Sequence, residues 1–170
     1  MIPKGVVVHC SDTPNGKDIG GAAEIDKWHR ARGFSSIGYH IVINPGERGV
    51  EMARSLQMRG AHCSDKIYVG GSTWISGNDC VGICLIGRDA FTGSQLDSLH
   101  YYLHAMTQMY EIYPERFFVH NVANKKKTCP GFSNSVLISW YMGRWESIKP
   151  YWIRGSGFAR INSGIGSDQG

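Results

Sequence analysis

Gly5-Val6-Val7-Val8-His9-Cys10 is a short run of β-branched residues that ends in a histidine and a cysteine. A run of this length and composition predicts a buried strand. A second apolar run spans residues 80–87 (Cys-Val-Gly-Ile-Cys-Leu-Ile-Gly) and shows no alternation with polar residues. That pattern is typical of a central strand covered on both faces. The two runs together predict a sheet that is buried between layers.

Helices and strands alternate along the rest of the chain. The apolar periodicity predicts helices over residues 22–32, 94–113 and 134–149, with Ser94 as the cap of the second and Asp97 three residues on. Further strands are expected at 39–43, at 49–53 as its hairpin partner, and at 117–120. Residues 54–79 are rich in Gly and Ser, have no period, and predict a long loop. This order predicts one α/β domain with a central mixed sheet flanked by helices.

Length and composition exclude several classes of protein. The chain has 170 residues, 42% hydrophobic and 19% charged, which fits a single globular domain and excludes disorder as the main state. We expect this domain at residues 1–150 and a Gly/Ser-rich tail at 151–170. The apolar runs are too short to cross a bilayer, and the first residues do not have the pattern of a signal peptide. We therefore expect synthesis in a cytosol without membrane insertion.

The charge and the cysteines narrow the choice further. A net charge of +4 suits a protein that approaches an anionic polymer: nucleic acid, a membrane surface or a cell wall. Five cysteines, with no CxxC pair, argue against a disulfide framework and against a zinc ribbon. Lys125-Lys126-Lys127 has no interleaved aromatic residues, so a nucleic-acid site is not predicted. A metal site would need ligands from distant positions.

Two predicted strands end in histidine, His9 and His120, and Cys129 follows nine residues after the second. Two neutral imidazoles and one thiolate leave a zinc dication with an open position for water, which is the catalytic arrangement. Spacing alone fits two boundary histidines and a small buried cysteine better than a metal site. Type-1 copper is disfavoured because no methionine lies close to Cys129.

Further short blocks follow one another in a fixed order. They are Val8–Ser11, Trp28-His29 with Gly33-Phe34 and Ile37–Ile43, Gly60-Ala61-His62 with Asn78, Val81–Gly87, and His120-Asn121 with Lys127–Phe132. Together they resemble the zinc-dependent N-acetylmuramoyl-L-alanine amidases of the type-2 family, which is similar in fold to the peptidoglycan recognition proteins. The resemblance covers roughly residues 5–140.

The resemblance implies a site. His9, His120 and Cys129 match the ligands of one zinc ion per chain. Tyr39 matches the tyrosine beside the metal, and Lys127 matches the catalytic lysine. The implied reaction is attack of water on the amide between the lactyl group of muramic acid and L-alanine, with Lys127 and zinc stabilising the oxyanion.

The remaining implied positions concern substrate binding and one ambiguity. His62 and Asn78 match the substrate groove. The run from His120 to Cys129 is one residue longer than is usual in the phage members, so Lys125 competes with Lys127 for the catalytic role. We favour Lys127, because the Cys-Pro turn fixes what lies just before it. The loop at 63–77 also looks long for the family.

Several histidines have simpler interpretations. His29 is expected to pack or to support the site from behind. His40 follows Tyr39 on a strand and should face the opposite side of the sheet, unless the strand is bulged. His100 and His104 are four residues apart on a helix and fit boundary positions better than a metal pair.

These patterns predict a monomeric peptidoglycan amidase, made in the host cytoplasm as a phage endolysin and acting on the periplasmic wall. The alternative is a non-catalytic peptidoglycan-binding module, which typically lacks the cysteine ligand. A regulatory protein-binder and a metal-free hydrolase with Cys129 as nucleophile are two further hypotheses.

Overall fold

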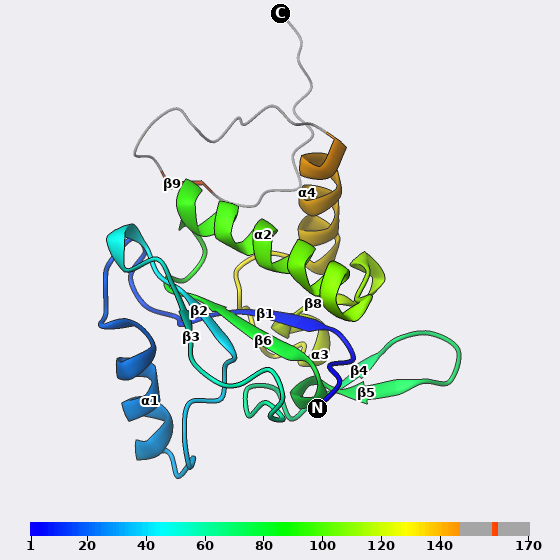
Figure 1. The fold of residues 1–170 in the computed structure, drawn as a ribbon, viewed down its shortest axis with the longest axis horizontal. Coiled ribbons are helices and arrows are strands. Elements are labelled where there is room, and N and C mark those ends of the chain that lie inside the picture. Colours follow the sequence, from blue (N-terminus) through cyan, green and yellow to red (C-terminus); the bar gives the residue numbers. More distant parts are fainter. Residues whose placement is uncertain (147–157, 160–170) are drawn as a thin grey trace, which may run out of the picture.

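A five-stranded sheet forms the centre of the molecule (Figure 1), in a computed structural model that describes residues 1–146 and 158–159. The strand order is β3-β2-β6-β1-β8, with β1 Val6–Cys10, β2 Ile41–Ile43, β3 Val50–Met52, β6 Val81–Leu85 and β8 Phe117–Val119. Only β3 runs antiparallel within this sheet; the other pairs are parallel. The predicted mixed sheet is confirmed, and β6 is its central, fully buried strand.

Two helices cover one face of the sheet, α2 Gly93–Tyr110 and α4 Asn134–Glu146 (Figure 1). The predicted apolar stripe of α2 is buried against the strands, at Leu96, Leu99, Leu103 and Met106. For α4, the predicted residues 147–149 lie outside the described part of the chain.

The start of α2 differs from the prediction. Thr92, not Ser94, caps the helix: its side chain accepts from the backbone N–H of Gln95, and the Gln95 side chain accepts from the backbone N–H of Thr92. This capping box satisfies two N–H groups that would otherwise lack partners. The Gln95 amide also donates to the carbonyls of Ile43 and Ile86, so it joins the helix to two strands.

The other face has two separate covers. Helix α1 Gly21–Ala31 packs through Ile25 against Val42 and Ile86. A β-hairpin of β4 Lys66–Tyr68 and β5 Trp74–Ser76 packs through Ile67 and Ile75 against Val7 and Phe118, and these four residues belong to one buried cluster. The prediction of an irregular loop over 54–79 is therefore wrong at this hairpin, because three-residue strands are too short to display a period.

The remaining elements are short. They are η1 Gly46–Arg48, η2 Gly77–Asp79, η3 Pro114–Arg116, α3 His120–Ala123, and the strand pair β7 Phe91–Thr92 and β9 Phe158–Ala159. Within the tail predicted at residues 151–170, residues 158–159 form β9, whereas the domain boundary predicted at 150 lies outside the described residues. Within the described residues, no helix is long and apolar enough to cross a membrane.

Candidate metal centre and active-site cleft

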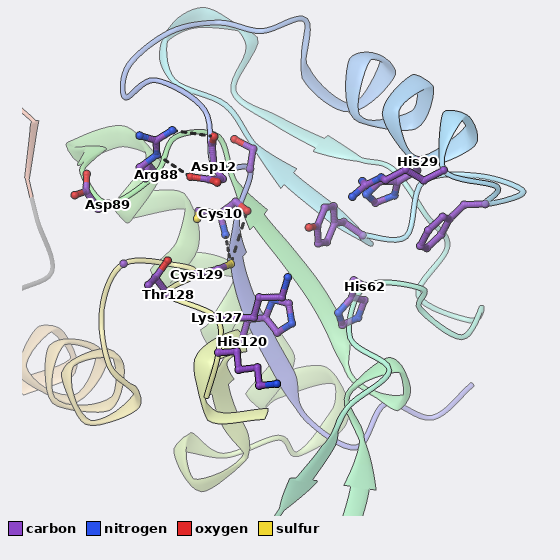
Figure 2. A pocket seen from close by; sticks show the side chains of 16 residues that line it. Cys10, Asp12, His29, His62, Arg88, Asp89, His120, Lys127, Thr128 and Cys129 are labelled. Atoms are coloured by element: carbon purple, nitrogen blue, oxygen red, sulfur yellow. Dashed lines mark hydrogen bonds and ion pairs between the residues drawn. The ribbon is translucent and has the colours of Figure 1, made fainter. Parts of the chain in front are cut away.

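A cleft of about 850 Å³ opens beside the carboxyl end of β1. Cys129, Lys127 and His120 lie on one side of it, and His62 and His29 lie on the other (Figure 2). Residues from six segments line the cleft: 10–12, 29–34, Tyr39, His62, 88–89 and 120–131. Ligands bind at this place in open α/β sheets, where the parallel strands end.

The three predicted metal ligands meet at this cleft. The Nδ1 atoms of His9 and His120 are 3.2 Å apart, and the Sγ atom of Cys129 is 4.0 Å from Nδ1 of His9. Tetrahedral zinc, with Zn–N near 2.0–2.1 Å and Zn–S near 2.3 Å, separates its ligand atoms by about 3.3–3.6 Å. The separation of the two nitrogens lies just below this range, and the separation of sulfur and nitrogen lies above it. The donor set and its spacing therefore fit a zinc ion.

Different elements supply the three ligands. His9 is the fourth residue of β1 and is fully buried, with Cys84 of β6 as its neighbour in the sheet. His120 begins α3 rather than ending β8, which stops at Val119. Cys129 lies in a turn in which the N–H of Gly131 donates to the carbonyl of Thr128.

Hydrogen bonds tie the Cys129 turn to the sheet. The backbone N–H of Cys10 donates to Sγ of Cys129 at 3.1 Å, and the N–H of Asn121 donates to its carbonyl. The neighbouring Cys10 thiol, together with burial, raises the pKa of the Cys129 thiol. The thiol therefore keeps its proton until a bound cation displaces it.

His62 contacts His9, one of the three candidate metal ligands. Its Nδ1 lies 2.9 Å from Nε2 of His9, and its Nε2 lies 3.1 Å from the carbonyl oxygen of Cys80. Burial is the main reason that the pKa of His62 is lowered to about 3 and that of His9 is held well below its usual value. Both imidazoles are therefore neutral near pH 7, which is the form that binds metals.

Asn78 acts on the backbone around His62. Its Oδ1 accepts from the N–H groups of His62 and Cys63, both at 2.8 Å. The side chain thus fixes the loop that presents His62, and Asn78 is not among the residues that line the cleft. Its direct contact with substrate stays a prediction.

The prediction that Tyr39 and His40 face opposite sides is wrong. The Tyr39 ring lies 5.1 Å from His9 and 6.1 Å from His62, and the His40 ring lies 5.7 Å from the same His62. Both side chains share one face because β2 begins only at Ile41, so strand alternation does not apply before it. The backbone is also irregular there, since the carbonyl of His40 accepts from two successive N–H groups.

Lys127 lines the cleft, and Lys125 is not among its lining residues. Lys127 is also close enough to His120 for its charge to add to burial in lowering the pKa of that histidine. Both observations favour Lys127 over Lys125 as the cation beside the metal centre.

His29 packs as expected. Its Nδ1 accepts from the backbone N–H of Gly38, and its ring stacks on Phe34 and lies 5.3 Å from Tyr39. It therefore supports the Tyr39 ring from the side of α1. In contrast, His100 packs against Trp140 and Tyr141, away from the cleft.

A second group of potential ligands was missed in the sequence. Cys63, Asp65 and His120 also bring one ligand atom each to within 4.8 Å of one another. The spacing Cys63-x-Asp65 was the available signal, but it lies in the stretch that reads as loop. This second group shares His120 with the first group of ligands, His9, His120 and Cys129. The two groups would therefore compete for one metal ion.

Comparisons with known proteins identify the family of the chain. The family model for N-acetylmuramoyl-L-alanine amidases matches residues 1–132. The chain belongs to this family. The amidase is 34% identical over 135 residues to the endolysin of Enterobacteria phage K11, a match that covers 74% of this chain and 78% of that protein. It is 31% identical over 137 residues to the endolysin of Enterobacteria phage T3, covering 76% and 81%.

Solved structures share the fold of the amidase. LysC, an N-acetylmuramoyl-L-alanine amidase from Clostridium intestinale, superimposes with a TM-score of 0.63 at 23% identity, covering 84% of this chain and 86% of that one. Bumblebee PGRP-SA gives a TM-score of 0.63 at 22% identity, covering 82% and 83%. The predicted α/β fold and the amidase family are both confirmed.

Proposed function

We propose that this amidase is a zinc-dependent phage endolysin. The observation that carries the proposal is that His9, His120 and Cys129 bring ligand atoms within 4.8 Å of one another beside the cleft that Tyr39 and Lys127 line. The bond to be cut joins the lactyl group of N-acetylmuramic acid to L-alanine. One zinc ion per chain, held by the three ligands, would act as a Lewis acid toward the amide carbonyl and the attacking water.

Lys127 supplies a positive charge next to the metal centre. Hydrolysis of an amide places negative charge on the carbonyl oxygen, and a fixed cation in a partly dry cleft stabilises that charge strongly. The lysine lies in the exposed part of the 120–131 segment, so its long side chain can reach a substrate that fills the cleft.

Tyr39 supplies a hydrogen-bond donor. Burial is the main cause that raises the pKa of its phenol well above the usual value, so the hydroxyl stays protonated at neutral pH. A neutral phenol can donate to the developing oxyanion or to the attacking water. Packing against His9 and His29 holds the ring at the cleft wall.

The charges around the cleft suit an anionic peptide. Arg32, Arg88, Lys126 and Lys127 line it together with Asp12 and Asp89. Arg88 is bound to Asp12 at 2.7 Å, which leaves Arg32 and the two lysines as cations with which substrate carboxylates can pair. One structural relative, AmiD of E. coli, is known in complex with anhydro-N-acetylmuramic acid-L-Ala-D-gamma-Glu-L-Lys.

The biological setting follows from the endolysin relatives. We infer that the protein is made in the cytoplasm of a bacterial host and acts on the wall as a monomer at lysis. The tail at 151–170 would then be an addition to an amidase domain at 1–150. A non-catalytic wall-binding module is the alternative, but Cys129, the ligand that such modules lack, argues for the enzyme.

The decisive test is mass spectrometry of peptidoglycan incubated with the zinc-loaded protein. We expect free stem peptides with an exposed L-alanine amine, beside glycan strands without peptide. Wall that binds the protein and stays uncut would overturn the enzyme in favour of the binding module.

A further inference from the structure

We propose that His62 is a positioning residue that fixes the tautomer and the orientation of His9 at the metal centre. The inference rests on the proposed zinc site, because it assigns a role toward that metal. It extends the groove-lining role that the family resemblance implies for His62. Three neighbouring groups, the carbonyl of Cys80 and the rings of His62 and His9, lie within hydrogen-bonding distance of one another in a chain.

The order of donors and acceptors follows from one fixed point. The carbonyl oxygen of Cys80 can only accept, so Nε2 of His62, 3.1 Å away, must carry the proton and donate. A neutral imidazole carries a single ring proton, so Nδ1 of His62 is then a bare acceptor. Nε2 of His9, 2.9 Å from that acceptor, must therefore carry its own proton.

The consequence appears at the other side of the His9 ring. With the proton on Nε2, Nδ1 of His9 holds a free lone pair. Nδ1 is the atom that lies 3.2 Å from Nδ1 of His120 and 4.0 Å from Sγ of Cys129. The chain from Cys80 through His62 thus presents the correct nitrogen to the metal before any metal binds. Metal-bound histidines are commonly oriented in this way, by a hydrogen bond from the ring nitrogen that does not bind the metal.

The fold reserves space for the His62 ring. A Cβ atom at Gly82 would lie 2.4 Å from Cδ2 of His62, and one at Gly60 would lie 2.6 Å from the same atom. Any side chain at either position would displace the ring. Asn78 fixes the backbone of His62 by accepting a hydrogen bond from its N–H group. The position of the residue, the rotation of its ring and the place of its ring proton are therefore all determined. A residue that only lined a groove would not need such a cradle.

Two substitutions of His62 distinguish the effect of its hydrogen bond to His9 from the effect of its ring volume. His62→Phe keeps a ring but removes the acceptor, whereas His62→Asn keeps an acceptor near the place of Nδ1. We expect His62→Phe to weaken zinc binding by ~10–100-fold, measured by competition with a chelator, and His62→Asn to recover part of the loss. Gly82→Ala, which leaves His62 in place but pushes its ring, should resemble His62→Phe.

A second readout needs neither metal nor substrate. Long-range ¹H–¹⁵N NMR spectra of the metal-free full chain should show His9 protonated at Nε2, and His62→Phe should shift His9 toward a mixture of tautomers. An unchanged His9 tautomer and unchanged zinc affinity in His62→Phe, with only a higher KM, would overturn the proposal. If the wild-type protein bound no zinc, the proposed function would fail, yet the tautomer measurement would still decide the role of His62.

Discussion

The two walls of the cleft are built in different ways. The inner wall carries His62 and Tyr39 beside the central strands. Behind them lies the fully buried His9 of β1, which contacts His62, and His62 in turn bonds to the carbonyl of Cys80 just before β6. The outer wall carries His120, Lys127 and Cys129 on a four-residue helix and turns whose residues 125–128 are exposed. We therefore expect the inner wall to be rigid without metal and the outer wall to gain order when its ligands bind the same ion.

The largest effect should come from breaking the link between the walls. Cys129→Ser removes the thiolate and should abolish hydrolysis. It should also lower zinc affinity by more than ~100-fold, which is the largest loss expected when a residue that only supports a ligand is replaced. Peptide release from purified peptidoglycan and chelator competition measure the two effects.

Cys63→Ser is the matched control, because Cys63 belongs to the competing ligand group with Asp65 and His120. It should keep zinc affinity and hydrolysis. Loss of zinc in Cys63→Ser with retention in Cys129→Ser would move the metal to that second group. Full hydrolysis by the wild type in excess chelator would instead favour Cys129 as a nucleophile.

The next effect concerns chemistry on the outer wall alone. Lys127→Ala should lower kcat by ~10²–10³-fold, because it removes a charge that stabilises the oxyanion, with little change in zinc affinity. Lys125→Ala is the matched control, because it removes the same charge from the same run of three lysines. Its kcat should stay within about twofold of the wild type, since Lys125 does not line the cleft. The reverse ranking would assign the catalytic role to Lys125.

The inner wall should be recognisable in the pH dependence of stability. His62, with a pKa of about 3, and His9 resist protonation in the folded chain, while both ionise near pH 6.5 when unfolded. The unfolded chain therefore binds more protons below pH 6.5, so the folded state loses stability as the pH falls from about 6.5 toward 3.

Urea titrations of the metal-free protein measure this loss. Each histidine contributes at most ~1.4 kcal/mol per pH unit to the free energy of unfolding. His62→Asn should make the profile less steep, because it removes one of the buried histidines whose pKa is lowered in the folded chain. A wild-type stability that does not change between pH 7 and pH 4 would contradict the buried, neutral state of the pair.

The smallest effect should distinguish the walls by their dynamics. Zinc at 100 times its dissociation constant should add ~2.7 kcal/mol to the free energy of unfolding. Hydrogen exchange should show that zinc protects residues 120–131 much more than β1, whose amides are already protected by the sheet. Equal protection of both segments would mean that the outer wall is as rigid as the inner one.

The sequence predicts the inner wall well where a pattern repeats. The run 5–10 predicts β1 and places His9 at a strand end, and the run 80–87 predicts β6, because buried parallel strands are continuously apolar. Short or irregular segments are different. The hairpin β4–β5 has three-residue strands, and the shared face of Tyr39 and His40 depends on backbone that precedes β2.

The site itself is only partly readable. The family resemblance names His9, His120 and Cys129, whose ligand atoms then meet across more than 100 residues. Nothing in the local sequence indicates that His62 bonds to His9 or that Gly60 and Gly82 make room for its ring. Those relations arise from the packing of three segments and become visible only in the folded chain.

In the proposed enzyme, one zinc ion joins the two walls through His9, His120 and Cys129. X-ray absorption at the zinc K-edge of the purified, zinc-loaded protein tests it directly. We predict a four-coordinate ion with two nitrogen ligands near 2.0–2.1 Å and one sulfur near 2.3 Å, the last position being held by a lighter atom. A zinc spectrum without sulfur, or one that keeps its sulfur in Cys129→Ser, would contradict it.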